Sequence, residues 1–344
     1  MKEKFPLLGE LTPGTTQRHL VKLPGAALAN DEPRAVITVT GNESGPTLFV
    51  NGGLHGAEYP AIEAVSRLGK ILDPKTINGT VILMPVLNLP AFRSRTPFLC
   101  PIDNVNPNRV FPGDPNGSYS EQMVHALVNE FIAHADAYID LHGGDIPEDL
   151  VPFVICAEAS EATEPVEAVK SVDQKSKEMA MAFGLPYVLT VSKPVQVAKG
   201  LSSYAGAAER GVPAILAEAG GVGQLQEDAV ELLVNGVLKV MRHLGMMASD
   251  REANAERRTP NAERRMEEAK VLTAFEWVYS KHAGMWYSGV SAGDIITKGQ
   301  EIGTIGDLFG DVLETIIAPV TGTVLFLTIN PSVQENGLLM GIGC

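Results

Sequence analysis

The chain has 344 residues, of which 45% are hydrophobic and 20% charged, and its formal net charge is −14. This composition is typical of a soluble globular protein, and no apolar run reaches the roughly 20 residues that a membrane-spanning helix needs. The acidic balance argues against a nucleic-acid surface, which requires clustered Lys and Arg. The chain is too long for one small core, so we expect one large domain and a smaller one.

The N-terminal sequence "MKEKFPLLGELTPGTTQ" lacks the apolar region of a secretory signal, and we therefore expect a cytoplasmic location. Three cysteines, Cys100, Cys156 and Cys344, are too scattered for a disulfide framework or a cysteine-rich zinc site. Any metal must therefore be bound by histidines and carboxylates. The basic cluster from Arg251 to Arg265 is interleaved with glutamates, which favours a solvated helix or linker.

Short β-branched runs alternate with longer runs of helical periodicity through the first two thirds of the chain. Strands are predicted at residues 35–41, 47–53, 80–88, 137–144, 151–156, 186–192 and 213–221. Helices are predicted at residues 56–72, 120–135, 165–184 and 227–245. Several strands are apolar almost throughout, as expected for a sheet that is covered on both faces. The pattern indicates an α/β domain.

The alternation ends near residue 250, where a charged segment begins. Beyond it, glycine recurs at short intervals between β-prone runs, which predicts a compact all-β unit of short strands. We place the boundary within residues 250–270 and divide the chain into residues 1–255 and 256–344.

The stretch "GGLHGAE" at residues 52–58 follows a buried strand and begins a predicted helix. Ligands bind at the carboxyl ends of strands in open α/β sheets, so His55 and Glu58 are placed to share a cation. His142 ends another apolar strand in "AYIDLHGG" and supplies a third ligand. Two histidines and one carboxylate leave a coordination position open, as in catalytic zinc sites. The alternative for His55 and Glu58 alone is a polar loop, because so short a pattern is weak.

Glu218 ends the strand "PAILAEAGG" and is the predicted general base, since its carboxyl group should project at the same sheet edge. The alternative is a structural role, in which Glu218 is a solvated side chain that caps the end of its strand. Asn108 and Arg109, in the Pro- and Gly-rich loop "NVNPNRVFPG", are predicted to bind a carboxylate, because the guanidinium group pairs with it in two-pronged fashion. Arg93 and Arg95 are available for the same anion or for a developing oxyanion, or are surface arginines.

Together, "GGLHGAE", "NPNRVFPG", "DLHGGD" and "PAILAEAGG" resemble the motifs of the succinylglutamate desuccinylase and aspartoacylase family. The catalytic domain of that family is similar to zinc carboxypeptidases, and the resemblance covers residues 35–245. It implies an α/β fold with a mixed sheet flanked by helices, and a zinc-dependent amidohydrolase that removes an N-acyl group, acetyl or succinyl, from a small amino acid or related amine.

Carried over to this chain, the resemblance implies one zinc ion per chain on His55, Glu58 and His142. It further implies that Glu218 is the general base and that Asn108 and Arg109 bind a substrate carboxylate. The arginine that polarises the carbonyl group precedes the Asn-Arg pair in the family. Here Arg95 is preferred for that role, with Arg93 as a substrate-binding alternative.

Two acids after "DLHGG", Asp145 and Glu148, depart from the family pattern. If they face the site, they favour a substrate with an amino group over a dicarboxylate, and Asp145 is a predicted substrate-binding residue. Their alternative is a place outside the site, because Asp and Glu are usually solvated.

The C-terminal unit resembles the family's second domain, a small β-barrel similar to biotinyl and lipoyl carrier domains. Carriers need a lysine at an exposed hairpin tip, and no lysine follows Lys298. The unit is therefore expected to narrow the active-site entrance. The alternative functions are a carboxypeptidase acting on short peptides and a non-catalytic ligand-binding protein. A homo-oligomer is expected from base rates alone.

Overall fold

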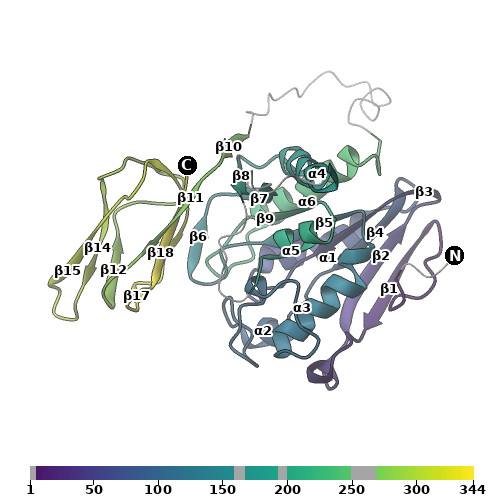
Figure 1. Cartoon of the computed structure of the whole chain (residues 1–344), viewed down its shortest axis with the longest axis horizontal. Helices are drawn as coiled ribbons and strands as arrows, with labels where there is room; N and C mark the ends of the chain where they lie inside the picture. Colours follow the sequence, from purple (N-terminus) through teal and green to yellow (C-terminus); the bar gives the residue numbers. More distant parts are fainter. Residues whose placement is uncertain (1–4, 159–166, 193–199, 249–268) are drawn as a thin grey trace.

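A computed structural model of the chain describes residues 5–158, 167–192, 200–248 and 269–344. It contains a large α/β unit and a C-terminal β unit (Figure 1). The large sheet has the strand order β1 (Thr15–Val21), β2 (Arg34–Thr40), β4 (Asn78–Met84), β3 (Glu43–Asn51), β5 (Ala137–His142), β9 (Ala214–Glu218), β7 (Phe153–Glu158), β8 (Tyr187–Ser192) and β10 (Lys270–Leu272). In the middle of the sheet, β4, β3, β5 and β9 are all parallel. Strand β2 pairs antiparallel with β4 on one side, and β7 pairs antiparallel with β9 on the other. The predicted mixed sheet is confirmed.

Helices cover both faces of this sheet. One core lies between the sheet and the helices α1 (Tyr59–Ile71), α4 (Glu167–Phe183) and α6 (Glu227–His243). The other core lies against α3 (Tyr119–Glu130) and α5 (Ser203–Glu209). In β3, Leu48 and Val50 belong to the first core and Phe49 to the second. Because alternate side chains enter different cores, the run from Leu48 to Val50 is apolar without interruption, as the sequence predicted.

The C-terminal unit consists of two antiparallel sheets around a core of its own. One sheet has the order β11 (Phe275–Tyr279), β18 (Leu338–Gly343), β16 (Gly322–Thr328) and β13 (Ile295–Ile296). The other has the order β15 (Val312–Ile317), β14 (Glu301–Gly306), β12 (Gly284–Ser288) and β17 (Ser332–Val333). The core between them includes Trp286, Ile302 and Met340. The predicted fold class, an α/β unit with a small all-β unit after it, is confirmed.

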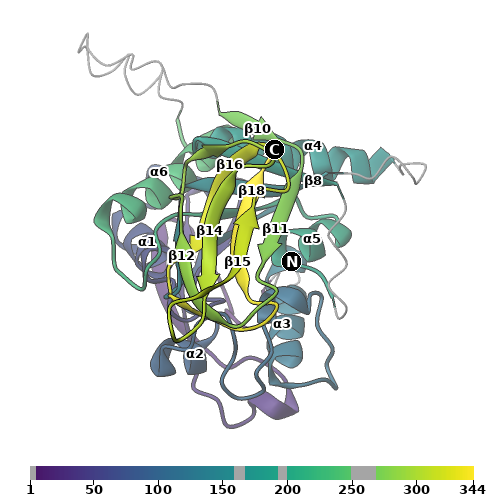
Figure 2. The ribbon, with the colours of Figure 1, turned by 90° about the vertical axis from the view of Figure 1, so that its left-hand side faces the viewer.

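The two units exchange strands. Strand β6 (Glu148–Leu150) leaves the α/β unit to pair antiparallel with β16, while β10 returns to pair parallel with β8. Phe153, Leu189 and Leu325 are buried together where the units meet. Figure 2 shows the C-terminal sheets in front of the α/β unit. The predicted boundary at residues 255 and 256, and the basic cluster Arg251 to Arg265, lie outside the described residues, and the division into domains stays a prediction.

Several short elements were not predicted from the sequence: β1, β6, α5, α2 (Leu89–Ser94) and the 3-10 helices η1 (Ala26–Leu28), η2 (Pro107–Arg109) and η3 (Ile132–His134). Strand β1 contains Thr, Gln, Arg and His among its apolar residues and lies at the edge of the sheet. The predicted helix over residues 120–135 ends at Glu130, and η3 follows it after Phe131. Glu58 is the residue just before α1 rather than a member of its first turn.

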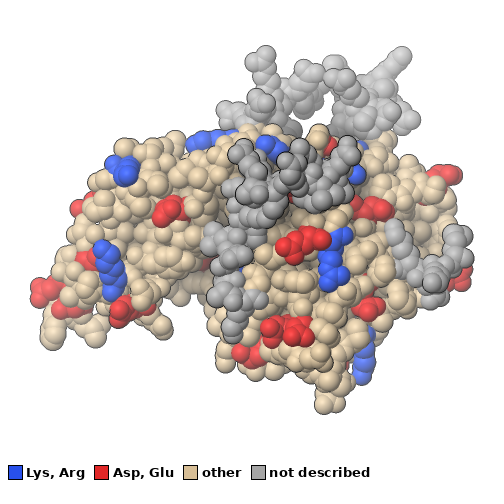
Figure 3. Space-filling model, in the orientation of Figure 1, with Lys and Arg blue, Asp and Glu red and all other residues tan. Residues whose placement is uncertain are grey.

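Charged side chains of both signs are interspersed on the face of the molecule drawn in Figure 3. Among the helices of the described ranges, none combines the length and the apolar character that crossing a membrane requires.

Candidate metal and active site

Four side chains singled out in the sequence lie at one edge of the large sheet. Strands β3, β5 and β9 are adjacent and parallel, so their carboxyl ends meet there. His142 and Glu218 are the last residues of β5 and β9 and stand opposite each other in the sheet register. His55 lies in the loop after β3. That loop packs tightly against α2, because a Cβ atom on Gly56 would lie 2.1 Å from the backbone of Ala91.

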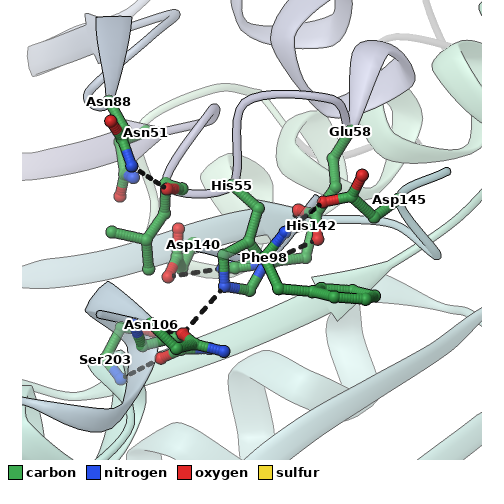
Figure 4. A network of polar contacts seen from close by, with 12 residues as sticks. Asn51, His55, Glu58, Asn88, Phe98, Asn106, Asp140, His142, Asp145 and Ser203 are labelled. Carbon is green, nitrogen blue, oxygen red and sulfur yellow. Dashed lines mark hydrogen bonds and ion pairs between the residues drawn. The ribbon is translucent and has the colours of Figure 1, made fainter. Parts of the chain in front are cut away.

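His55, Glu58 and His142 converge on one point, and all three are buried. Nδ1 of His55 lies 2.7 Å from Oε1 of Glu58, and Nδ1 of His142 lies 2.9 Å from Oε2 of the same carboxyl group. The candidate ligand atoms all lie within 4.8 Å of one another. The structure therefore brings together the three predicted metal ligands from the loop between β3 and α1 and from the end of β5, as Figure 4 shows.

The outer nitrogen of each imidazole has an oxygen partner. Nε2 of His142 lies 2.9 Å from Oδ2 of Asp140, and Nε2 of His55 lies 3.1 Å from Oδ1 of Asn106. Oxygen atoms at these positions can accept a hydrogen bond from Nε2–H and leave Nδ1 free to coordinate, and such a partner on the outer ring nitrogen is usual for histidines that bind metals. Asp140 and Asn106 are thus positioning residues for the two imidazoles.

The charges of the three converging side chains suit the binding of a divalent cation. Burial would raise the pKa of Glu58, but His142 and His55 outweigh it and lower the pKa to about 2. Burial would lower the pKa of His142, whereas Asp140 and Glu58 raise it well above its usual value. Two imidazole nitrogens and a carboxylate fit zinc, whose preferred ligands are of these types. The residues present can therefore hold a metal ion.

Glu218 lies beside this group without belonging to it. Its Oε2 atom is buried and has no hydrogen-bond partner among the described residues. Burial raises its pKa well above the usual value, and the charges of Glu58 and Glu148 add to this effect, although His142 opposes it. A nearby cation would favour the ionised form and bring the carboxyl group into the range of a proton acceptor.

Asn108 and Arg109 lie in η2, next to the site. Oδ1 of Asn108 accepts a hydrogen bond of 2.8 Å from the Ser203 backbone N–H, and Nη1 of Arg109 donates one of 2.8 Å to the Asn108 carbonyl oxygen. Burial lowers the pKa of Arg109, and the charges of Glu218, Glu148 and the ionised forms of Tyr204 and Tyr279 oppose that effect. Since Tyr279 belongs to β11, the C-terminal unit reaches the surroundings of Arg109.

The other two arginines lie at the end of α2. Arg93 is exposed and forms an ion pair with Glu32. Arg95 is exposed as well, with a φ of 56° at the C-terminal cap of α2. The carbonyl-polarising role of Arg95 and the substrate-binding role of Arg93 stay predictions.

Asp145 faces the site and is fully buried. Its Oδ2 accepts a hydrogen bond of 2.9 Å from the Phe98 backbone N–H, and its Oδ1 accepts one of 2.7 Å from the Ile146 N–H. The Phe98 ring packs edge-on against His55, with the ring centroids 5.8 Å apart. Burial and the charge of Glu58 raise the pKa of Asp145 to about 6. These contacts fix the wall of the site beside His55, and the substrate-binding role of Asp145 stays a prediction.

Asp140 and Asn106 were not identified from the sequence. A signal for Asp140 existed, because residues two apart on a strand face the same side, and Asp140 precedes His142 by two positions. Asn106 lies 51 residues after His55, and nothing local to either residue predicts their contact.

The chain also matches known proteins. The model of the succinylglutamate desuccinylase/aspartoacylase catalytic domain matches residues 44–244. N-alpha-acetyl-L-2,4-diaminobutyric acid deacetylase from Halomonas elongata is 30% identical over 300 residues, which are 85% of this chain and 80% of the relative.

Two solved structures share the fold. The product-bound ectoine utilization protein EutE (DoeB) from Ruegeria pomeroyi has a TM-score of 0.81 and 22% identity, over 100% of this chain and 99% of that one. Succinylglutamate desuccinylase/aspartoacylase from Rhodobacter sphaeroides has a TM-score of 0.77 and 24% identity, over 95% of this chain and 94% of that one. The resemblance seen in the four motifs is confirmed: this chain belongs to the succinylglutamate desuccinylase/aspartoacylase family.

Proposed function

We propose that the chain is a zinc-dependent deacylase that removes an acetyl or succinyl group from an N-acylated small amino acid or related amine. The observation that carries this proposal is the convergence of His55, Glu58 and His142 beside Glu218, which is in register with His142 and whose buried Oε2 has no hydrogen-bond partner among the described residues. A binding protein needs no such base beside its metal ligands. The family and the deacetylase from Halomonas elongata support the same reaction class.

In the proposed reaction, separate residues bind the metal, transfer the proton and hold the substrate. Zinc, when bound by His55, Glu58 and His142, supplies an electrophile that acidifies water and polarises an amide carbonyl group. Glu218 accepts the proton of the attacking water and returns it to the leaving amine. Arg109 and the amide of Asn108 hold the substrate carboxylate, which orients the scissile amide. Such orientation contributes up to about 7–11 kcal/mol in the best intramolecular reactions.

The direct test measures the metal content of the purified protein together with acyl release from a panel of substrates. The panel contains N-acetyl and N-succinyl amino acids, N-alpha-acetyl-2,4-diaminobutyrate and unblocked dipeptides. One zinc per chain with release from an N-acyl compound is the expected result. Cleavage of the dipeptides alone would favour a carboxypeptidase, and a protein without metal or turnover would contradict the proposal. A homo-oligomer stays a prediction, which gel filtration with light scattering would test.

Arg109→Ala is expected to raise KM about 10- to 100-fold for substrates with a free carboxylate, the loss expected for one charged hydrogen-bonded contact. The matching substrate amides should change much less. Steady-state kinetics on each acid and its amide measure the difference. Arg67→Ala is a suitable control, because Arg67 pairs with Glu227 at the surface. An equal rise in KM for each acid and its amide would show that Arg109 does not bind the substrate carboxylate.

Asp140→Asn is expected to weaken zinc binding about 10- to 100-fold, as losses of a histidine's hydrogen-bond partner do elsewhere. The asparagine amide oxygen can still accept a hydrogen bond from Nε2–H of His142. The substitution removes the negative charge that stabilises the imidazole. Competition with a chelator measures the affinity, and thermal melting tests the fold. Glu231→Gln removes one exposed charge from α6 as a control. Unchanged affinity would show that Asp140 does not act on the metal site.

A further inference from the structure

The backbone of Glu148 is held between the loops that carry His142 and Glu218. Its N–H donates a hydrogen bond of 3.0 Å to the Gly144 carbonyl oxygen, and its own carbonyl oxygen accepts one of 2.9 Å from the Val222 N–H. A Cβ atom would lie 2.5 Å from this carbonyl oxygen at Gly144 and 2.3 Å from it at Gly221. Glycine at both positions therefore allows β6 to approach the carboxyl ends of β5 and β9.

The C-terminal unit fixes β6 from the other side. Glu148 pairs with Thr328 of β16, and Leu150 pairs with Phe326. Backbone bonds continue beyond the strand on both sides, from the Ile329 N–H to the Pro147 carbonyl oxygen and from the Val151 N–H to the Leu325 carbonyl oxygen. Glu148 thus lies beside the metal ligands but is positioned by a strand of the β unit.

The surroundings of the Glu148 carboxyl group favour a bound cation. Burial raises its pKa to about 8, the charges of Glu58 and Asp145 contribute to the rise, and Arg109 opposes it. Within the described ranges, no hydrogen bond engages this carboxyl group, whereas both oxygens of Asp145 already accept backbone hydrogen bonds. A metal at Glu58 and the guanidinium of Arg109 offset part of the repulsion. A cation that contacts the Glu148 oxygens directly would complete the compensation.

We propose that Glu148 binds the free ammonium group of an N-acyl diamino acid whose carboxylate is held by Arg109. This inference rests on the proposed deacylase function and deepens it. The backbone contacts place Glu148 beside the ends of β5 and β9, near Arg109, so a bound cation that holds Glu148 ionised would give the site a negative pole opposite the positive pole of Arg109. A zwitterionic substrate matches both poles, and a dicarboxylate would bring a second negative charge to Glu148. The β unit thereby takes part in selecting the substrate, by positioning β6.

The test compares two substrates that differ only in the ammonium group: N-alpha-acetyl-2,4-diaminobutyrate and N-acetyl-2-aminobutyrate. Glu148→Gln keeps the size of the side chain and removes its charge. The variant is expected to lose about 10- to 100-fold in kcat/KM for the diamino substrate, the value of a charged hydrogen bond, and to change less than about 3-fold for the other. Asp149→Asn is the matched control, since its side chain points to the opposite face of β6.

An equal loss for both substrates would overturn the proposal, because Glu148 would then act through Arg109 or the metal. Turnover of N-acetyl-2-aminobutyrate without preference for the diamino compound in the wild type would also overturn it, while leaving the deacylase function intact. If the zinc-loaded wild type hydrolysed neither compound, calorimetry with 2,4-diaminobutyrate and 2-aminobutyrate would decide independently of turnover. Tighter binding of the diamino acid that is lost in Glu148→Gln supports the subsite, and equal binding contradicts it.

Discussion

Glu218→Gln is expected to bind one zinc per chain as the wild type does and to lose about 10²- to 10⁴-fold in kcat, the range for removal of a general acid or base. Glu218 is not one of the three converging ligands, and the amide keeps the shape of the side chain at the end of β9. The amide cannot accept the proton of the attacking water, and KM should therefore change little.

The result separates catalysis from metal binding when zinc content and turnover are measured on the same preparation. Glu231→Gln serves again as the control for loss of one negative charge. Near-full activity in Glu218→Gln would show that another group accepts the proton. Loss of zinc together with turnover would instead identify Glu218 as a part of the metal site.

His142→Ala is expected to abolish both zinc binding and hydrolysis, and His55→Ala should behave alike. Each change removes a converging ligand atom, so the loss in affinity should exceed the about 10- to 100-fold that follows loss of a histidine's hydrogen-bond partner. In His142→Ala, the carboxyl groups of Asp140 and Glu58 also lose their shared partner, which adds to the repulsion between them.

Metal analysis and acyl-release assays measure the outcome, and circular dichroism shows whether the variants fold. His125→Ala is the matched control, because this histidine lies on α3 and contacts Asn129 instead of the site. Retention of one zinc per chain in His142→Ala would place the metal elsewhere. Zinc loss with a folded chain would establish His142 as a ligand.

The sequence by itself determined seven of the nine strands of the large sheet, including those that end at His142 and Glu218. Runs such as residues 137–142 are apolar because their side chains enter cores on both sides of the sheet, and this property is local to each run. His142 and Glu218 could be placed at strand ends for the same reason. The period of two along β5 also places Asp140 and His142 on the same side of the strand.

Only the tertiary structure decided which strand ends are neighbours. The order of β3, β5 and β9 depends on crossovers through helices, and hydrophobic periodicity does not encode the order of strands in a sheet. Asn106, the partner of His55, and Ser203, the first residue of α5 and the partner of Asn108, each lie far along the chain from the residue they contact. The place of Glu148 depends on β6 pairing with β16, more than 170 residues later, and on backbone hydrogen bonds with Gly144 and Val222, none of which the local sequence predicts.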